Sequence, residues 1–182
     1  MLYLLRHGQT DWNIDFRLQG TTDIPLNATG LAMAREAHDR YQDIPLDICF
    51  VSPLSRAVQT AELVLAGRDI PMVTDERLHE LDFGSFDGMR RADAPEGHPV
   101  YTLFHTPERY VAEGGAEPLE SLYARTGAFL ADRVAPLQAE GKDILIVAHG
   151  AVNRAIINRV RGIPLARFWE TRLDNCTMVA LE

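Results

Sequence analysis

Four arginine and histidine side chains stand just beyond apolar runs of the sequence, where the strands of a sheet would end. They are Arg6, His7, Arg56 and His149. Open α/β sheets bind ligands beyond the carboxyl ends of their strands. If the apolar runs are neighbouring strands, two arginines and two histidines meet at one place. Such a cluster predicts an anion site, and phosphate is the obvious anion because a guanidinium donates two parallel hydrogen bonds to it.

Other arrangements that bind phosphate or metal do not occur in the sequence. It contains neither a Gly-x-x-x-x-Gly-Lys-Ser/Thr loop nor a Gly-x-Gly-x-x-Gly segment after a strand. A cysteine-based phosphatase needs a thiolate in a loop that an arginine closes, whereas Cys49 lies inside an apolar run, where burial should raise its pKa. We expect no metal site, because the remaining histidines lack metal-ligand spacing. These are His38, His79, His98 and His105.

The elements that must position these residues alternate between apolar strands and helices. The apolar runs predict strands at residues 2–5, 47–51, 72–73, 143–148 and 177–181. Helical spacing of apolar residues predicts helices at about 28–41, 56–65, 118–137 and 151–160. Pro136 should kink or end the third of these helices, and Gly141 should close the turn beyond it.

The strands are apolar on both faces, which is typical of a parallel sheet covered by helices on both sides. We therefore predict an α/β fold: a three-layer α/β/α sandwich with a mostly parallel central sheet and a short helical cap insertion. The chain has 182 residues, of which 46% are hydrophobic, and it fits a single domain over 1–182. Residues 84–118 lack a clear period, and we interpret them as an irregular, partly helical insertion that caps the site.

The net charge of −8 disfavours binding to nucleic acid or to an anionic membrane, because the chain has no run of basic residues. No apolar stretch approaches the roughly 20 residues that span a bilayer. The apolar N-terminal residues end at Arg6, so we expect no signal peptide. With two cysteines only, a reducing cytoplasm is the expected location. A homodimer is compatible with this composition.

An ordered set of motifs resembles a known family. The motifs are Leu5-Arg6-His7-Gly8-Gln9-Thr10 with Trp12-Asn13, Arg17-Leu18-Gln19-Gly20, Pro25-Leu26, Ser52-Pro53-Leu54-Ser55-Arg56-Ala57-Val58-Gln59-Thr60-Ala61, Leu78-His79-Glu80-Leu81-Asp82-Phe83-Gly84 and Val147-Ala148-His149-Gly150. In this order they resemble the signature of the histidine phosphatase superfamily, the phosphoglycerate-mutase-like proteins. The likeness covers nearly the whole chain and weakens only between Gly84 and Pro118.

The resemblance implies a role for each member of the predicted site. His7 would be the nucleophile that forms a phosphohistidine intermediate. Arg6, Arg56 and His149 would bind the equatorial phosphoryl oxygens. Glu80 would protonate the leaving oxygen and then activate water. The expected substrate contacts are Asn13, Gln19, Gly20 and Gly150.

Two details of the motifs leave alternatives open. Asp82 is a second candidate for the general acid, two residues after Glu80. The segment Gly115-Ala116-Glu117-Pro118 resembles a Gly-Gly-Glu-Ser element of the family whose serine is replaced by proline. A hydroxyl contact from that position is therefore not expected.

The segment that follows Glu80 is short and resembles the phosphatase branch of the family, whereas the related mutases carry a basic insertion there. We predict metal-independent hydrolysis of a small phosphorylated metabolite, without a cofactor. A cofactor-dependent phosphoglycerate mutase is the alternative, and an inward-pointing Arg90, Arg91 or Arg109 would favour it. A phosphate-binding protein without turnover is the third reading. The substrate stays open among sugar phosphates, phosphoglycerates, phosphoserine and nucleoside-like phosphates such as α-ribazole phosphate.

Overall fold

The computed structural model describes residues 1–181, and their strands form one five-stranded sheet. The strands are β1 (Leu2–Arg6), β2 (Ile48–Val51), β3 (Met72–Thr74), β4 (Ile144–Ala148) and β5 (Met178–Leu181). Their spatial order is β3-β2-β4-β1-β5. The first four are parallel to their neighbours, and β5 pairs antiparallel with β1 at the edge. The predicted mostly parallel sheet is confirmed.

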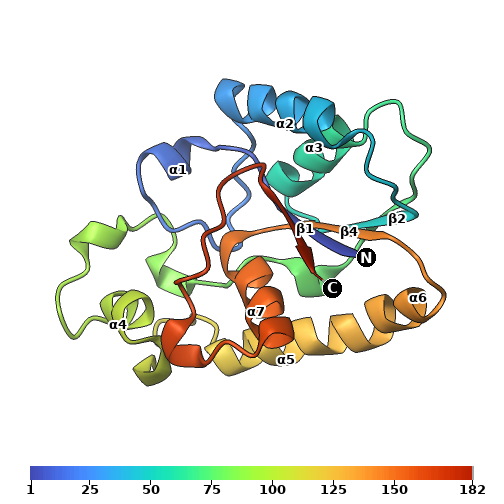
Figure 1. The fold of residues 1–182 in the computed structure, drawn as a ribbon. Coiled ribbons are helices and arrows are strands. Elements are labelled where there is room, and N and C mark those ends of the chain that lie inside the picture. The colour runs from blue at the N-terminus through green and yellow to red at the C-terminus, as the bar shows by residue number, and fades with distance from the viewer. Residues whose placement is uncertain (182) are drawn as a thin grey trace.

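Helices cover both faces of this sheet (Figure 1). On one face lie α2 (Ala28–Tyr41) and α3 (Ser55–Val64), and on the other lie α5 (Leu119–Phe129), α6 (Ala135–Ala139) and α7 (Gly150–Arg161). The three-layer sandwich expected from the sequence is therefore present. No helix within residues 1–181 is both long and apolar enough to cross a membrane.

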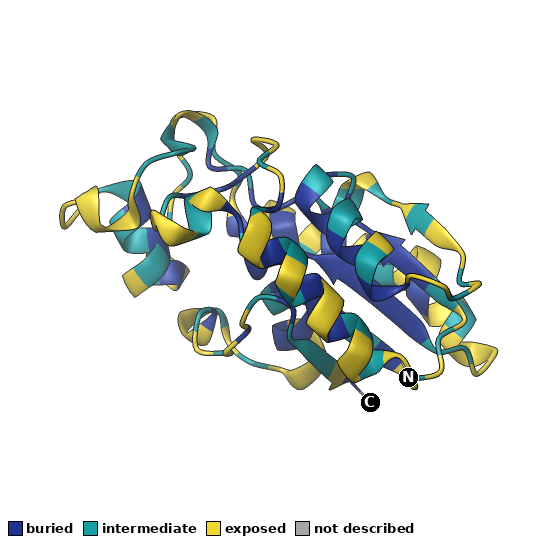
Figure 2. Ribbon diagram, turned by 90° about the horizontal axis from the view of Figure 1, so that it is seen from above, coloured by how far each residue is buried: buried dark blue, intermediate teal, exposed yellow. Residues whose placement is uncertain are grey.

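Two cores result because successive side chains of a strand point to opposite faces of the sheet. In β4, Ile144 and Ile146 pack with residues of α5 and α7, whereas Leu145 and Val147 pack with residues of α2 and α3. Every residue of β4 is buried, and the strands form the dark interior in Figure 2. Burying one such side chain stabilises a fold by about 1.5–3 kcal/mol. The central strands are therefore rigid supports for the residues at their ends.

The helix that contains Pro136 continues past this residue. Its hydrogen bonding widens to a π-helix over Leu130–Val134 and returns to an α-helix over Ala135–Ala139. A proline has no N–H to donate to the preceding turn, so the regular pattern is interrupted just before it. Gly141, with φ of 77°, then closes the turn as predicted.

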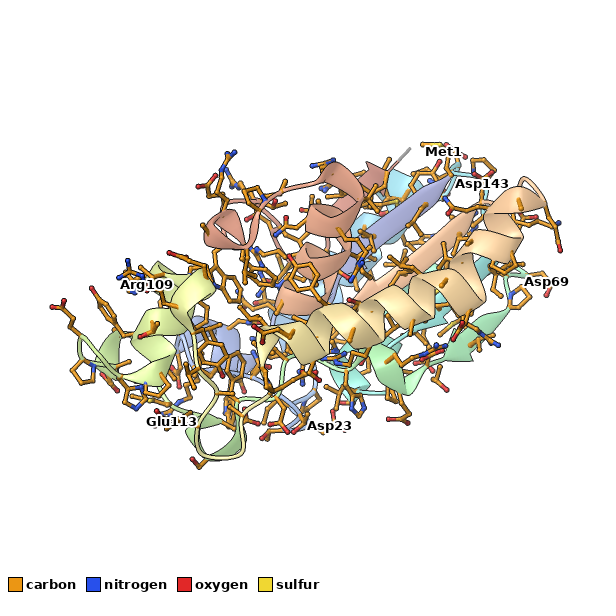
Figure 3. The ribbon with its side chains drawn as sticks, turned by 90° about the horizontal axis from the view of Figure 1, so that it is seen from below. Met1, Asp23, Asp69, Arg109, Glu113 and Asp143 are labelled. Atoms are coloured by element: carbon orange, nitrogen blue, oxygen red, sulfur yellow. The ribbon has the colours of Figure 1, made fainter. Side chains whose placement is uncertain are left out.

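Residues 84–118 form short 3₁₀ turns and the helix α4 (Pro99–His105), in agreement with the irregular, partly helical segment predicted. Figure 3 shows Arg109 and Glu113 of this segment at one end of the molecule and Met1 and Asp143 at the other. The stretch after β1 was predicted to be a loop, but it contains α1 (Asp11–Ile14).

Candidate active site

The carboxyl ends of three adjacent parallel strands bring the predicted charged residues together. Arg6 ends β1 and lies beside Ala148, the last residue of β4. His7 and His149 follow these two strands directly, and their ring centroids are 5.2 Å apart. Arg56 belongs to the first turn of α3, which follows β2. The convergence expected from the sequence is present.

The ring of His7 is buried, with 3% of the residue exposed, and it has a defined proton position. Its Nδ1 lies 2.7 Å from the carbonyl oxygen of Gly8. Because a carbonyl oxygen only accepts, Nδ1 carries the proton and Nε2 keeps its lone pair. Burial, followed by the positive charges of Arg56 and Arg6, lowers the pKa of His7 well below 6.5. The ring is therefore neutral at pH 7.

His149 and Arg56 form a second, fully buried pair. Nε of Arg56 donates to Nδ1 of His149 (3.2 Å), so Nε2 of His149 carries the proton and donates to the Ser52 hydroxyl (2.7 Å). Other N–H groups of Arg56 donate to the carbonyl oxygens of Gly20 and Thr22, both at 2.9 Å. Burial and then the charge of Arg56 lower the pKa of His149 well below 6.5. This pair fastens the loop at residues 20–22 to the end of the sheet.

Arg6 has a buried hydrogen-bond donor without an acceptor. Its Nη1 donates to the carbonyl oxygen of Leu173 (3.0 Å), but no atom of residues 1–181 accepts from its buried Nε. Burial lowers the pKa of Arg6, and the nearby carboxylate of Glu80 opposes this shift. An unpaired buried donor costs about 1–3 kcal/mol, more when it is charged. An anionic ligand at this place would remove that penalty.

A cleft of about 230 Å³ opens beside these groups. The predicted site residues that line it are Arg6, His7, Asn13, Gln19, Glu80 and Gly150. Arg56, His149 and Gly20 lie outside the cleft lining. The N–H of Gly20 donates to Asp87 and its carbonyl oxygen accepts from Arg56, so its predicted contact with substrate stays a prediction.

Asn13 and Gln19 line the cleft, and their side-chain oxygens already accept hydrogen bonds. The side-chain oxygen of Asn13 accepts from the backbone N–H of Thr10 (3.0 Å), and that of Gln19 accepts from the Thr10 hydroxyl (2.7 Å). Within residues 1–181, neither amide nitrogen has an acceptor at hydrogen-bond distance. Both side chains can therefore donate to an anion.

Glu80 is held at the N-terminal end of α7. Its Oε1 accepts from the backbone N–H groups of Leu81 (2.8 Å), Ala151 (3.2 Å) and Val152 (3.3 Å). Its Oε2 and Nε of Arg6 lie 3.6 and 3.8 Å from the point where a Cβ on Gly150 would stand. The carboxylate and the unpaired arginine nitrogen thus both lie beside Gly150, and the charge of Glu80 acts on Arg6. Asp82, the other candidate acid, accepts from the N–H of Gly84 and does not line the cleft.

Arg125 on α5 supports the segment that leads to Glu80, and the sequence analysis did not identify it. Its guanidinium donates to the carbonyl oxygens of Arg77 (2.6 Å), His79 (2.7 Å) and Glu80 (3.2 Å). It also forms two hydrogen bonds to the carboxylate of Glu117, at 2.8 and 2.9 Å. The only feature of the sequence that pointed to this arrangement was the Gly-Ala-Glu-Pro element, because its glutamate, Glu117, is the partner of Arg125.

The cleft lining also contains residues that were not predicted to contact substrate. They are Arg17, Leu18, Phe83, Arg91, Phe104, Ala151, Arg154 and Trp169. Arg91 had been named as a residue whose inward position would favour a mutase, and it does line the cleft, whereas Arg90 and Arg109 do not. Arg154 and Trp169 had no motif to mark them.

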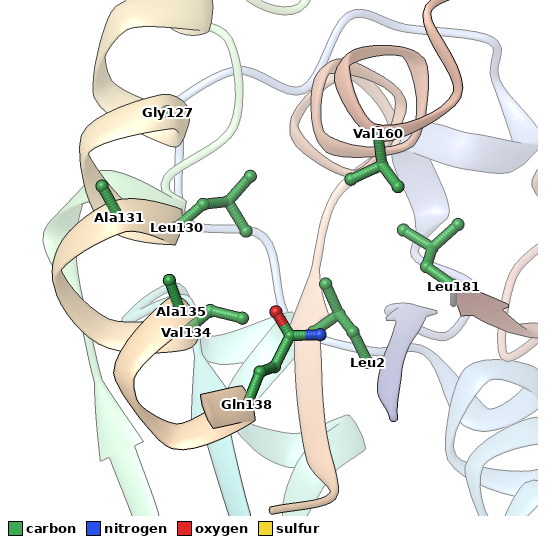
Figure 4. A pocket seen from close by; sticks show the side chains of 9 residues that line it. All are labelled: Leu2, Gly127, Leu130, Ala131, Val134, Ala135, Gln138, Val160 and Leu181. Carbon is green, nitrogen blue, oxygen red and sulfur yellow. The ribbon is translucent and has the colours of Figure 1, made fainter. Parts of the chain in front are cut away.

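A larger, apolar cavity of about 360 Å³ lies at the amino-terminal edge of the parallel strands (Figure 4). Leu2, Leu181 and Val160 line one side of it, and residues of the α5–α6 helix line the other. Gln138 is its most polar side chain, and the lining contains no nucleophile, acid or base. The chemistry therefore belongs to the smaller cleft.

Known proteins are similar to the chain over nearly its whole length. The family described as the histidine phosphatase superfamily (branch 1) matches residues 2–182. A Bacillus subtilis protein named "Uncharacterized phosphatase PhoE" is 34% identical over 98% of the chain and 86% of its own length. A 2,3-bisphosphoglycerate-dependent phosphoglycerate mutase 2 of Gloeobacter violaceus is 30% identical over 100% of the chain and 85% of its own length.

Solved structures show the same fold. The structure of Bacillus stearothermophilus YhfR superposes with a TM-score of 0.86 at 29% identity, covering 97% of this chain and 88% of its own. The chain therefore belongs to the histidine phosphatase superfamily, whose members include both phosphatases and mutases.

Proposed function

We propose that the protein hydrolyses a small phosphomonoester without a metal, through a phosphohistidine on His7. One observation carries the proposal: a buried neutral imidazole with a free Nε2 stands beside the unpaired Nε of Arg6 in a cleft. A phosphoryl oxygen would take the free arginine donor, and the phosphorus atom would then face the free nitrogen lone pair.

In the first step, Nε2 of His7 attacks phosphorus while the bond from phosphorus to the ester oxygen breaks. Glu80 gives its proton to that oxygen, and the alcohol leaves. Arg6 and Arg56 offset the negative charge on the equatorial oxygens. His149 would donate to a phosphoryl oxygen through its Nε2–H, which donates to the Ser52 hydroxyl in this structure and exchanges that partner for the ligand.

In the second step, water attacks the phosphohistidine and the bond between phosphorus and Nε2 breaks. The carboxylate of Glu80 accepts the proton of the attacking water, and inorganic phosphate leaves. The ring of His7 recovers its starting form because its Nδ1 keeps the proton donated to Gly8 throughout. Glu80 is then ready to act as an acid again.

A phosphoglycerate mutase is the second candidate, and the position of Arg91 in the cleft favours it. A mutase holds the phosphohistidine until a bound product takes the phosphoryl group back, so it must exclude water. The short segment after Glu80 and the similarity to PhoE favour the phosphatase. A protein that binds phosphate without turnover is disfavoured, since His7, Glu80 and Arg6 all line one cleft.

The test is phosphate release from para-nitrophenyl phosphate in the presence of a chelator. The proposal predicts turnover by the wild type and a loss of about a thousandfold or more in His7→Ala, because the nucleophile is removed. His105→Ala, which removes an exposed histidine of α4, is the matched control and should keep full activity. Equal rates in wild type and His7→Ala would refute the proposed nucleophile. Conversion of 3-phosphoglycerate to 2-phosphoglycerate, exceeding phosphate release, would identify a mutase instead.

A further inference from the structure

The loop whose carbonyl oxygens bind Arg56 is itself held by a carboxylate of another segment. Asp87 follows the segment that carries Glu80, and its two oxygens accept three hydrogen bonds from this loop. Oδ1 accepts from the N–H of Gly20 (3.1 Å), and Oδ2 accepts from the N–H (3.2 Å) and the hydroxyl (2.7 Å) of Thr22. The carbonyl oxygens of the same two residues accept from Arg56. Gly20 and Thr22 therefore link Asp87 to Arg56.

The partners of Arg56 set the orientation of its guanidinium. This planar group has five N–H donors, and three of them donate to Gly20, Thr22 and His149. Within residues 1–181 the other two, one on each terminal nitrogen, have no acceptor. Because the guanidinium is rigid, the partners that hold three donors also fix the direction of the remaining two.

The loop is pressed closely against the segment that contains Asp87. A Cβ on Gly20 would stand 3.0 Å from both the carbonyl oxygen of Leu81 and the backbone nitrogen of Phe83, so this position has no room for a side chain. Two backbone hydrogen bonds join Leu18 to residues 88 and 89, both at 2.9 Å. The loop therefore cannot move without disturbing the segment that follows Glu80.

Asp87 also supplies negative charge near Arg56 without neutralising it. Burial lowers the pKa of Arg56, and the carboxylates of Glu80, Asp23 and Asp87 oppose this shift. Arg56 forms no ion pair within residues 1–181. Asp23 fastens the end of the loop, because it accepts from the N–H (2.8 Å) and the hydroxyl (2.7 Å) of Ser55. The guanidinium is thus held by carbonyl oxygens and keeps its charge for a ligand.

We propose that Asp87 is a positioning residue: it fixes residues 20–22, whose carbonyl oxygens orient the two remaining donors of Arg56 toward the phosphoryl group. This inference rests on the proposed function, which assigns Arg56 to the equatorial oxygens. Arg56 is then oriented before the substrate binds, so no reorganisation is needed during the reaction. Asp87 does not line the cleft and acts through Arg56.

The first test needs no ligand and measures how firmly Arg56 is held. Proton–nitrogen NMR gives the exchange rate with water of the Arg56 Nε–H, which donates to His149. In Asp87→Asn, which removes the charge and one acceptor oxygen, exchange should be about tenfold faster. Thr22→Val removes one hydrogen bond, should give a smaller increase, and keeps the test open if Asp87→Asn does not fold. Asp93→Asn, an exposed change in the same segment, is the control and should leave the rate unchanged.

The second test asks whether Asp87 acts on the reaction through Arg56. With para-nitrophenyl phosphate, kcat/KM should fall about tenfold in Asp87→Asn. When Asp87→Asn is added to Arg56→Met, we expect no further loss, because the group that Asp87 orients is already absent. A contribution of Asp87 to folding alone would act equally in both backgrounds.

An unchanged exchange rate in Asp87→Asn and Thr22→Val would overturn the inference, and so would equal losses of kcat/KM in the two backgrounds. If exchange becomes faster but no phosphomonoester is hydrolysed, the proposed function fails, and calorimetry with vanadate replaces the kinetic test. Weaker binding of vanadate by Asp87→Asn than by the wild type and Asp93→Asn then supports the positioning role, and equal affinities refute it.

Discussion

Two neighbouring imidazoles in the site have opposite proton positions, each fixed by its own partner. The carbonyl of Gly8 places the proton of His7 on Nδ1, and the Arg56 guanidinium leaves the proton of His149 on Nε2. Both rings are buried beside arginines, which lowers both pKa values. One ring therefore presents a lone pair to the cleft, while the other is engaged by Arg56 and Ser52.

Long-range proton–nitrogen NMR spectra should show this arrangement directly. At pH 7 and at pH 6 we expect His7 as the neutral Nδ1–H form and His149 as the neutral Nε2–H form, since burial disfavours the charged rings. A protonated His7 at pH 6, or a proton on its Nε2, would contradict the account of the nucleophile.

His7 and His149 could be predicted because each follows a recognisable strand end. Glu80 and Asn13 were expected from the motifs that resemble the family. The prediction of His7, Glu80 and Asn13 in one cleft is in agreement with the structure. Arg154 and Trp169 were missed because they reach the cleft from the second turn of α7 and from an irregular segment after that helix. Nothing in local spacing indicates which face of a helix will meet a cleft built from distant segments.

At the scale of elements, α5 contributes to the site without lining it. Arg125 of this helix does not line the cleft. Its guanidinium donates to three backbone carbonyl oxygens in the segment that ends at Glu80. Glu117, just before α5, fixes the guanidinium with two hydrogen bonds. The helix therefore supports the segment that carries Glu80, the proposed general acid.

Arg125→Met should lower kcat about tenfold while KM changes little, because a displaced acid affects proton transfer more than binding. With para-nitrophenyl phosphate, whose leaving group needs less protonation, the effect should be smaller than with an alkyl phosphate. Glu120→Gln, an exposed change on the same helix, is the control. A loss of equal size on both substrates would indicate a structural defect rather than a displaced acid.

Strands and long helices were predicted with boundaries close to those observed because their apolar patterns are continuous. The helix α1 was missed because its four residues depend on a capping box, in which Thr10 and Asn13 bond to each other's backbone. Pro136 was expected to kink or end its helix, yet a π turn before it lets the helix continue. Short elements and local adjustments of this kind depend on individual hydrogen bonds that a periodic pattern does not encode.

At the scale of the whole molecule, one sheet between two cores fixes the site. The strand order could not be read from the sequence, because uniformly apolar strands fit several orders equally well. The antiparallel edge strand β5 was predicted as a strand but without its direction. His7 and His149 are buried in this fold with lowered pKa values, so the stability of the fold depends on pH.

The free energy of unfolding should fall when the pH is lowered from 7 to about 5.5. His7 and His149 have pKa values well below 6.5 in the folded protein, so below pH 6.5 the unfolded chain binds more protons and is favoured. Each such proton changes the free energy by at most about 1.4 kcal/mol per pH unit. Urea unfolding curves at several pH values measure this slope, and His149→Gln should reduce it. A protein that is more stable at pH 5.5 than at pH 7 would contradict these pKa directions.

The central claim is covalent transfer of the phosphoryl group to Nε2 of His7, and trapping that intermediate tests it most directly. In Glu80→Gln, para-nitrophenyl phosphate should still react because nitrophenolate leaves without an acid, but the water that follows has no base. We expect a burst of nitrophenolate stoichiometric with protein, and phosphorus NMR of the quenched protein should show phosphohistidine on Nε2, absent when His7→Ala is added. A burst without phosphohistidine, or a phosphoryl group on Nδ1 or on another residue, would contradict the account.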